Sequence, residues 1–118
     1  MQELALRNNC LETLPATFAN LKNLSYLTLS RNRFSRFPPE LLELPQLEWL
    51  WLAYNQIKTL PAEIAQLQKL HDLDLQGNQL SLLPETIGQL QNLCELRLGE
   101  NPLLSIPQTL KELRLNKN

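Results

Sequence analysis

The chain of 118 residues carries little excess charge and no long apolar run. Its 11 Lys and Arg residues nearly balance 12 Asp and Glu, which leaves a formal net charge of −1. Such a balance gives no global field that would attract nucleic acid or an anionic membrane. The leucines are spaced rather than continuous, so no segment approaches the roughly 20 apolar residues that cross a bilayer. These absences predict a protein that binds neither nucleic acid nor membrane.

Cysteine is also scarce, with Cys10 near one end of the sequence and Cys94 near the other. They occupy different positions of a repeat and should lie too far apart for a disulfide. Met1 leads directly into the first repeat, without the basic and apolar segments of a secretory signal. Reduced thiols and the missing signal predict a cytoplasmic protein.

Leucine, by contrast, is abundant and placed at a fixed period. The motif Leu-x-x-Leu-x-Leu-x-x-Asn-x-Leu-x-x-Leu-Pro-x-x-Ile-x-x-Leu-x-x recurs five times at an interval of 23 residues, starting at residues 1, 24, 47, 70 and 93. A period in this range indicates a solenoid, in which each repeat buries its apolar side by stacking on its neighbours. We therefore predict a single solenoid domain over residues 1–118.

The apolar positions of the repeat predict its local structure. Positions 1, 4, 6, 11, 14, 18 and 21 are apolar in all five repeats and should point inward. Positions 4 and 6 alternate with variable residues, which is typical of a short strand with one buried face. The strands should stack in parallel, because each is followed by a return segment in which Pro at position 15 suits the start of a helical turn. The asparagine at position 9 should bond the backbone of the tight turn after the strand.

This pattern resembles the leucine-rich repeat family, in the 23-residue form with Leu-Pro in mid-repeat that is found in Ras-group and many bacterial proteins. The resemblance covers essentially the whole chain. It implies an α/β fold: a right-handed solenoid with a concave parallel sheet and short helical or 3₁₀ segments on the convex side. It also implies that the chain recognises other proteins through the concave sheet.

The first repeat departs from the family pattern, because no capping segment is visible before it. Its inward leucines should then present an open apolar edge, formed by Leu4, Leu6, Leu11 and Leu14. Either another copy of the chain covers this edge, which would make a homo-oligomer, or the chain is a piece of a longer protein.

The last repeat can be read in two ways. Strict 23-residue phasing places Leu115 at position 23, where the other repeats carry polar residues. A shorter fifth repeat would instead restart the strand motif as Leu110-x-x-Leu113-x-Leu115-x-x-Asn118. We favour the second reading, which predicts a possible sixth strand within residues 110–118.

Candidate binding residues lie at the variable positions of the strands, where every Trp and Tyr of the chain falls. Trp49 and Trp51 are two apart on one strand, so both should project from the same side. Tyr26 should lie beside Trp49 on the preceding strand, and Tyr54 one turn further along. Exposed aromatic residues of this kind are the commonest interface hot spots. Alternatively, they stabilise the sheet by cross-strand pairing, worth about 0.2–1 kcal/mol per pair.

Acidic residues flank this predicted aromatic patch on its C-terminal side, with Arg97 opposing them. The residues predicted to bind a partner are Tyr26, Trp49, Trp51, Tyr54, Asp72, Asp74, Glu95 and Arg97. We expect a protein or peptide partner with an apolar or aromatic anchor for the patch and a segment bearing Lys or Arg over Asp72 and Asp74. For any single charge, the alternative is that it only keeps the surface soluble.

One column of residues suggests an enzyme instead. Stacking would place Glu48, His71 and Cys94 on successive strands about 5 Å apart, and these are the residue types of an acid–base–thiol triad. However, no glycine-rich turn or helix N-terminus offers a site for an oxyanion, and zinc sites usually need more ligands. We therefore predict no catalytic site, no metal and no cofactor.

The leading interpretation is a protein–protein interaction module that binds a partner protein or peptide through the concave face. Two alternatives remain open. The chain could be a self-associating structural unit that pairs through the open edge of its first repeat. It could also be the targeting arm of a larger protein, such as a bacterial effector or a ubiquitin-ligase-like protein.

Overall fold

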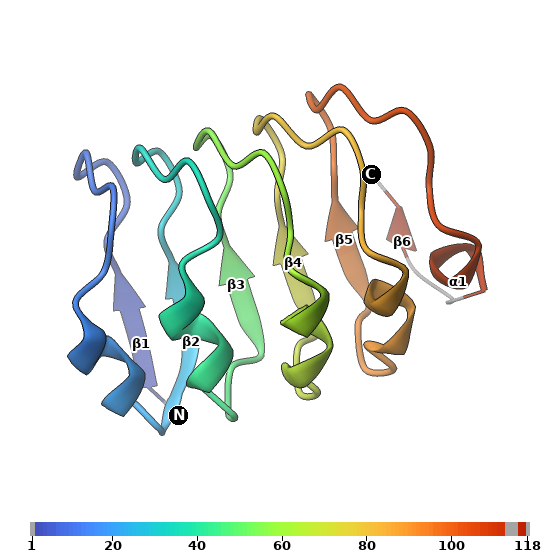
Figure 1. Ribbon diagram of the computed structural model, residues 1–118. Helices are drawn as coiled ribbons and strands as arrows, with labels where there is room; N and C mark the ends of the chain where they lie inside the picture. The colour runs from blue at the N-terminus through green and yellow to red at the C-terminus, as the bar shows by residue number, and fades with distance from the viewer. Residues whose placement is uncertain (1, 113–115, 118) are drawn as a thin grey trace.

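The chain winds into a curved stack of repeats in the computed structural model, which describes residues 2–112 and 116–117 (Figure 1). The strands form one parallel sheet in chain order, with neighbours β1 (Gln2–Ala5), β2 (Leu24–Thr28), β3 (Trp49–Trp51), β4 (Asp72–Asp74), β5 (Glu95–Arg97) and β6 (Asn116–Lys117). The opposite side carries 3₁₀ helices η1 (Ala16–Asn20), η2 (Pro39–Glu43), η3 (Ala62–Gln66) and η4 (Glu85–Gln89), and the short helix α1 (Gln108–Lys111). The predicted solenoid with a parallel sheet on one side and 3₁₀ turns on the other is confirmed.

Each return segment follows the local chemistry of its proline. Pro15, Pro61 and Pro84 have extended backbone and immediately precede a 3₁₀ helix. Since proline fixes φ and lacks an N–H, it costs no hydrogen bond at this place. Each of these helices buries the apolar residue at position 18, for example Ile64 in η3.

The core runs along the stack between the sheet and the 3₁₀ helices. At position 6, Leu29, Leu52 and Leu75 are fully buried. Leu6 at the same position of the first repeat is only partly buried, and Leu4 is too. The difference arises because an inner repeat packs against neighbours on both sides, as expected of a solenoid.

One residue of the predicted open edge does not belong to it. Leu14 is buried and lies in the core cluster together with residues of the following repeats, such as Phe18 and Phe37. The exposed part of this edge is therefore formed by Leu4, Leu6 and Leu11, each of which is half-buried.

The asparagines bond the turns as predicted. The side-chain amide of Asn55 donates to the backbone oxygens of Leu29 and Leu52, both at 3.1 Å, and its Oδ1 accepts the backbone N–H of Phe34 at 3.1 Å. Asn78 repeats these contacts one repeat further along. Within the described residues, no buried side-chain nitrogen or oxygen lacks a partner. These side chains are therefore structural, since an unpaired one would cost about 1–3 kcal/mol.

The residue before each asparagine has left-handed backbone, which the sequence analysis did not anticipate. The φ values at position 8 are 62° at Asn8, 58° at Arg31, 57° at Tyr54, 69° at Gly77 and 56° at Glu100. For residues other than glycine this conformation costs about 1–2 kcal/mol. Among the residues at this position, only Asn8 and Gly77 have residue types that favour this conformation.

The C-terminal region corrects part of the prediction for residues 110–118. Leu110 does not begin a strand; it lies in α1, 2% exposed, at the same repeat position as Ile87 in η4. The reason is that Pro107 starts a helical turn here as the prolines do in the earlier repeats. The short strand β6 follows at Asn116–Lys117 and pairs in parallel with β5. Leu113, Leu115 and Asn118, on which the strand motif depends, lie outside the described residues.

Candidate binding face

Three aromatic side chains form a stack on the concave face of the sheet. The rings of Tyr26 and Trp49 lie 4.4 Å apart between centroids and 22° from parallel. The rings of Trp49 and Trp51 lie 6.0 Å apart and 18° from parallel. The strand register explains the first contact, because Tyr26 on β2 pairs directly with Trp49 on β3. Three of the predicted binding residues are thus brought together, and Trp49 at their centre is 38% exposed.

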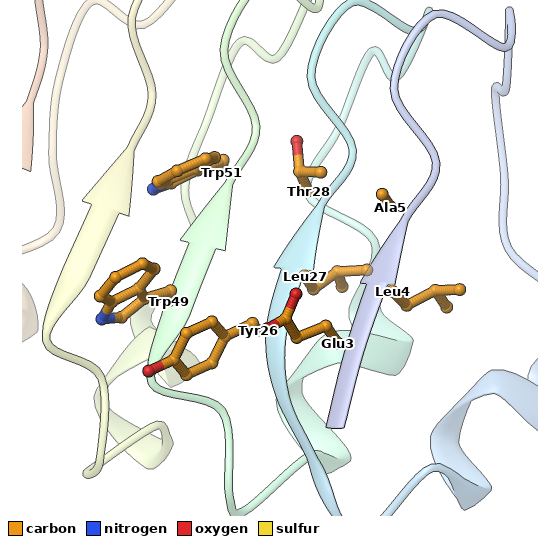
Figure 2. A pocket seen from close by; sticks show the side chains of 8 residues that line it. All are labelled: Glu3, Leu4, Ala5, Tyr26, Leu27, Thr28, Trp49 and Trp51. Carbon is orange, nitrogen blue, oxygen red and sulfur yellow. The ribbon is translucent and has the colours of Figure 1, made fainter. Parts of the chain in front are cut away.

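A hollow of about 230 Å³ adjoins this stack (Figure 2). It is lined by Glu3, Leu4, Ala5, Tyr26, Leu27, Thr28, Trp49 and Trp51. The strand register accounts for this hollow. Ala5, Thr28 and Trp51 are aligned across β1, β2 and β3, and the first two are small beside the indole of the third. The hollow is smaller than the roughly 300–1,000 Å³ of small-molecule sites, so it suits one side chain of a partner.

The acidic flank of the stack is already partly neutralised. Asp72 accepts a hydrogen bond from Nε1 of Trp51 at 3.3 Å and another from Nη1 of Arg97 at 3.3 Å. The same arginine donates through Nη2 to Glu95 at 2.5 Å. Asp72 and Glu95 are therefore less available to a partner than the sequence suggested.

Burial governs the ionisation of Asp72, whose side chain is 14% exposed. Desolvation raises the pKa of this carboxyl above its ordinary 3.8, and the charge of Arg97 and the hydrogen bond from Trp51 oppose the rise. Asp74, the other predicted anchor for a basic segment, accepts the backbone N–H of Gln76 at 3.0 Å.

Tyr54, predicted one turn further along in the aromatic patch, lies outside the aromatic stack. Its hydroxyl donates to Oε2 of Glu100 at 2.6 Å and accepts from Nε2 of Gln76 at 2.7 Å. The guanidinium carbon of Arg31 lies 4.5 Å from its ring centroid. Within the described residues, the only ring–ring contacts of this face are those of the stack. Left-handed backbone at Tyr54 turns its side chain across Gly77 instead.

We call this second group the Tyr54 cluster: Arg31, Tyr54, Gln76, Gly77 and Glu100. Sequence reasoning missed it, although four of its members share repeat position 8 and therefore stack above one another. The hydrogen bond to Glu100 is the main cause of a raised pKa at Tyr54. The cluster links the second, third, fourth and fifth repeats.

The residues of the suggested triad do not form a connected set. Nδ1 of His71 lies 3.8 Å from a carboxylate oxygen of Glu48. The thiol of Cys94 is directed instead to the backbone oxygen of Asn92, at 3.5 Å. Across residues 2–112 and 116–117, no group of three or more His, Cys, Asp or Glu side chains could hold a metal ion.

A family model described as leucine rich repeat matches residues 1–34 and 22–80, which is more than half of the chain. The chain belongs to the leucine-rich repeat family. Leucine-rich repeat domains generally bind proteins or peptides and are typically non-catalytic. In the described part of this leucine-rich repeat chain, no helix is long and apolar enough to span a membrane.

Solved leucine-rich repeat structures are similar over nearly all of this chain. One from Leptospira interrogans is 34% identical with a TM-score of 0.75, over 97% of this chain and 36% of its own. The plant peptide hormone receptor RGFR1, solved in complex with RGF2, is 30% identical with a TM-score of 0.83, over 98% and 20%. The leucine-rich repeat domain of the type III effector XopL is 25% identical with a TM-score of 0.87, over 99% and 44%. This chain therefore spans less than half of each of these proteins.

No curated protein sequence matches the chain closely enough to be counted as a relative.

Proposed function

We propose that this chain is a protein- or peptide-binding module whose binding surface is the concave face around Tyr26, Trp49 and Trp51. The observation that carries the proposal is the exposed indole of Trp49, held between two stacked rings beside a hollow of side-chain size. Stacking holds the rings in place, so a partner would bury a large apolar area without freezing many rotors. The peptide hormone receptor RGFR1, of similar fold, was solved with a bound partner.

In this proposal, the remaining predicted residues form the rim of the site. Arg97 bridges Asp72 and Glu95, so these three side chains would present a mixed polar border and not a purely acidic one. Asp74 retains a carboxylate oxygen for a cationic group, since its one hydrogen bond within the described residues uses Oδ1, which accepts from the backbone of Gln76. Tyr54 would contribute through the stability of its own cluster.

We extend the proposal to the repeat form and the compartment. The 23-residue Leu-Pro period supports membership in the Ras-group or bacterial form of the family. Cys10 and Cys94 are free and exposed, which supports a reducing, cytoplasmic environment.

The test is a selection of binding peptides from a phage-displayed random library, followed by measurement of each Kd by calorimetry. Trp49→Ala should weaken binding of the selected peptides by at least about tenfold, because truncation of a hot-spot residue costs about 2 kcal/mol or more. Leu104→Ala is the matched control, since Leu104 is an apolar side chain 80% exposed outside the strands. An equal loss in both variants, or no loss in Trp49→Ala, would contradict the proposal.

A second candidate function is self-association through the first repeat. It is favoured by the partial exposure of the inward residues Leu4, Leu6 and Leu11, whose counterparts in the inner repeats are buried. Sedimentation should then reveal a dimer that Leu6→Glu dissociates. A strict monomer at high protein concentration would exclude this function.

A third candidate is a targeting arm of a larger protein. The likeness to the leucine-rich repeat domain of a type III effector supports it, because that domain belongs to a larger effector protein. In that case the binding face would be the same, and the activity would lie in other residues.

A further inference from the structure

Six carboxylates lie on or beside the concave face, and five of them have a hydrogen-bond donor or a basic side chain close by. Asp72 and Glu95 bind Arg97, and Glu48 lies 3.8 Å from His71. Asp74 accepts a hydrogen bond from the backbone N–H of Gln76. Glu100 accepts one from the hydroxyl of Tyr54. The sixth is Glu3, which has no hydrogen bond or ion pair to any residue of 2–112 and 116–117.

Glu3 lines the hollow beside the stack. Its carboxylate lies next to the ring of Tyr26, on the β1 side of the aromatic residues (Figure 2). The other lining residues are apolar or aromatic, apart from the hydroxyl of Thr28. The hollow thus combines flat aromatic walls with one carboxylate at its rim that has no partner among the described residues.

This combination selects among side chains that could fill the hollow. A purely apolar side chain would contact the aromatic walls but gain nothing from the carboxylate of Glu3, which is exposed at the rim. A lysine ammonium could pair with Glu3 but is strongly hydrated and has no plane to stack. An arginine side chain meets both demands, since its guanidinium stacks on aromatic faces and forms two parallel hydrogen bonds with a carboxylate.

We propose that the hollow binds an arginine side chain of the partner, an inference that rests on the proposed function. The guanidinium would lie against Tyr26 and Trp49 and pair with the carboxylate of Glu3. The sequence analysis expected the partner's basic residues over Asp72 and Asp74, on the other side of the stack. The structure favours the β1 side because Arg97 already occupies the first of these carboxylates.

The experiment uses synthetic five-residue peptides, acetyl-Gly-Ser-Z-Ser-Gly-amide, with Z as arginine, citrulline, leucine or phenylalanine. Citrulline matches arginine in shape but is uncharged. Binding is followed by NMR from the indole N–H signals of Trp49 and Trp51. The arginine peptide should bind at least about tenfold more tightly than the citrulline peptide, since cation–π contact and the ion pair both require the charge.

Glu3→Gln should bring the arginine peptide close to the citrulline peptide in affinity. Asp74→Asn is the matched control, because it removes the same charge on the other side of the stack and should keep the preference for arginine. Both variants are checked for folding by circular dichroism. A preference that survives Glu3→Gln, or that Asp74→Asn reduces equally, would overturn the role of Glu3.

Failure of this inference is distinguishable from failure of the proposed function. If the leucine or phenylalanine peptide binds more tightly than the arginine peptide, the hollow is an apolar site and the arginine inference is wrong, while the binding face remains. If no peptide shifts the indole signals, the arginine site is also wrong, and the proposed function is decided by Trp49→Ala against library-selected peptides.

Discussion

Trp49 of the aromatic stack and Tyr54 of the Tyr54 cluster lie in the same repeat, yet the two side chains differ in what they already contact. The hydroxyl of Tyr54 already donates a hydrogen bond to Glu100 and accepts one from Gln76. Its ring lies between Arg31 and Gly77. Trp49 stacks on the rings of Tyr26 and Trp51 and keeps 38% of its surface exposed. An aromatic residue on a concave face is therefore not automatically available to a partner.

Backbone geometry causes this difference. Trp49 belongs to β3, where alternate side chains stand out from the sheet. Tyr54 has left-handed backbone in the turn after the strand, and its side chain runs across the next repeat. The stack is thus the region where binding is expected, and the Tyr54 cluster is the region that joins repeats.

The largest loss of stability should come from a substitution in the core of the third repeat, which carries both Trp49 and Tyr54. Leu50 lies between Trp49 and Trp51 and is fully buried. Leu50→Ala should lower the free energy of unfolding by about 2–5 kcal/mol, the usual cost of such a cavity. Urea denaturation measures this loss, and a loss below about 1 kcal/mol would show that the inner repeat is not packed as described.

A smaller effect should follow from Gly77→Ala, which affects the Tyr54 cluster alone. A Cβ at Gly77 would collide with Cδ1 of Tyr54, and alanine disfavours the φ of 69° found there. We expect a loss of about 1–2 kcal/mol in the free energy of unfolding, part of it from the left-handed backbone.

The steric part of the Gly77 effect can be separated by repeating the substitution in a Tyr54→Ala background. There Gly77→Ala should cost less, because the ring is gone. Equal costs in the two backgrounds would show that Tyr54 does not pack on Gly77.

The smallest effect concerns Asp72, at the border of the stack. The pKa of Asp72 is raised in the folded protein. Between pH 3.8 and that raised value, the folded state therefore binds more protons than the unfolded state. The stability contribution is thus fully present below pH 3.8 and is lost as pH rises through the folded pKa. Relative to Asp72→Asn, the wild type should therefore become more stable as pH falls through this window.

Urea denaturation of both proteins between neutral pH and pH 3 measures the Asp72 effect. The asparagine variant keeps an Oδ1 acceptor for the indole N–H of Trp51, so the two proteins differ mainly in charge. A wild type that loses stability relative to the variant on acidification would mean that the pKa of Asp72 is lowered.

Much of the fold follows from the sequence because it depends on period alone. Inward leucines, asparagines and prolines at fixed positions predict the sheet, the turns and the 3₁₀ helices. The contact of Tyr26 with Trp49 was predictable for the same reason, since a 23-residue interval places equivalent residues side by side. Leu110 was misplaced because its spacing to Leu113 matches a strand motif as well as a helical turn.

The details of the site depend on geometry that the period does not encode. The left-handed turn at Tyr54 has little sequence signal, because glycine occupies that position only at Gly77. The neutralisation of Asp72 depends on the side-chain conformation of Arg97, which reaches back to the preceding strand. Likewise, Glu3 emerges as the carboxylate without a partner in residues 2–112 and 116–117 only once the partners of the others are located.

The most direct test compares Trp49→Ala with Tyr54→Ala in both stability and peptide binding. Trp49→Ala should weaken the library-selected peptides by at least about tenfold while the melting temperature stays close to that of the wild type. Tyr54→Ala should lower the melting temperature and leave the peptide Kd nearly unchanged. The opposite pattern, with binding lost in Tyr54→Ala and retained in Trp49→Ala, would contradict the assignment of binding to the aromatic stack.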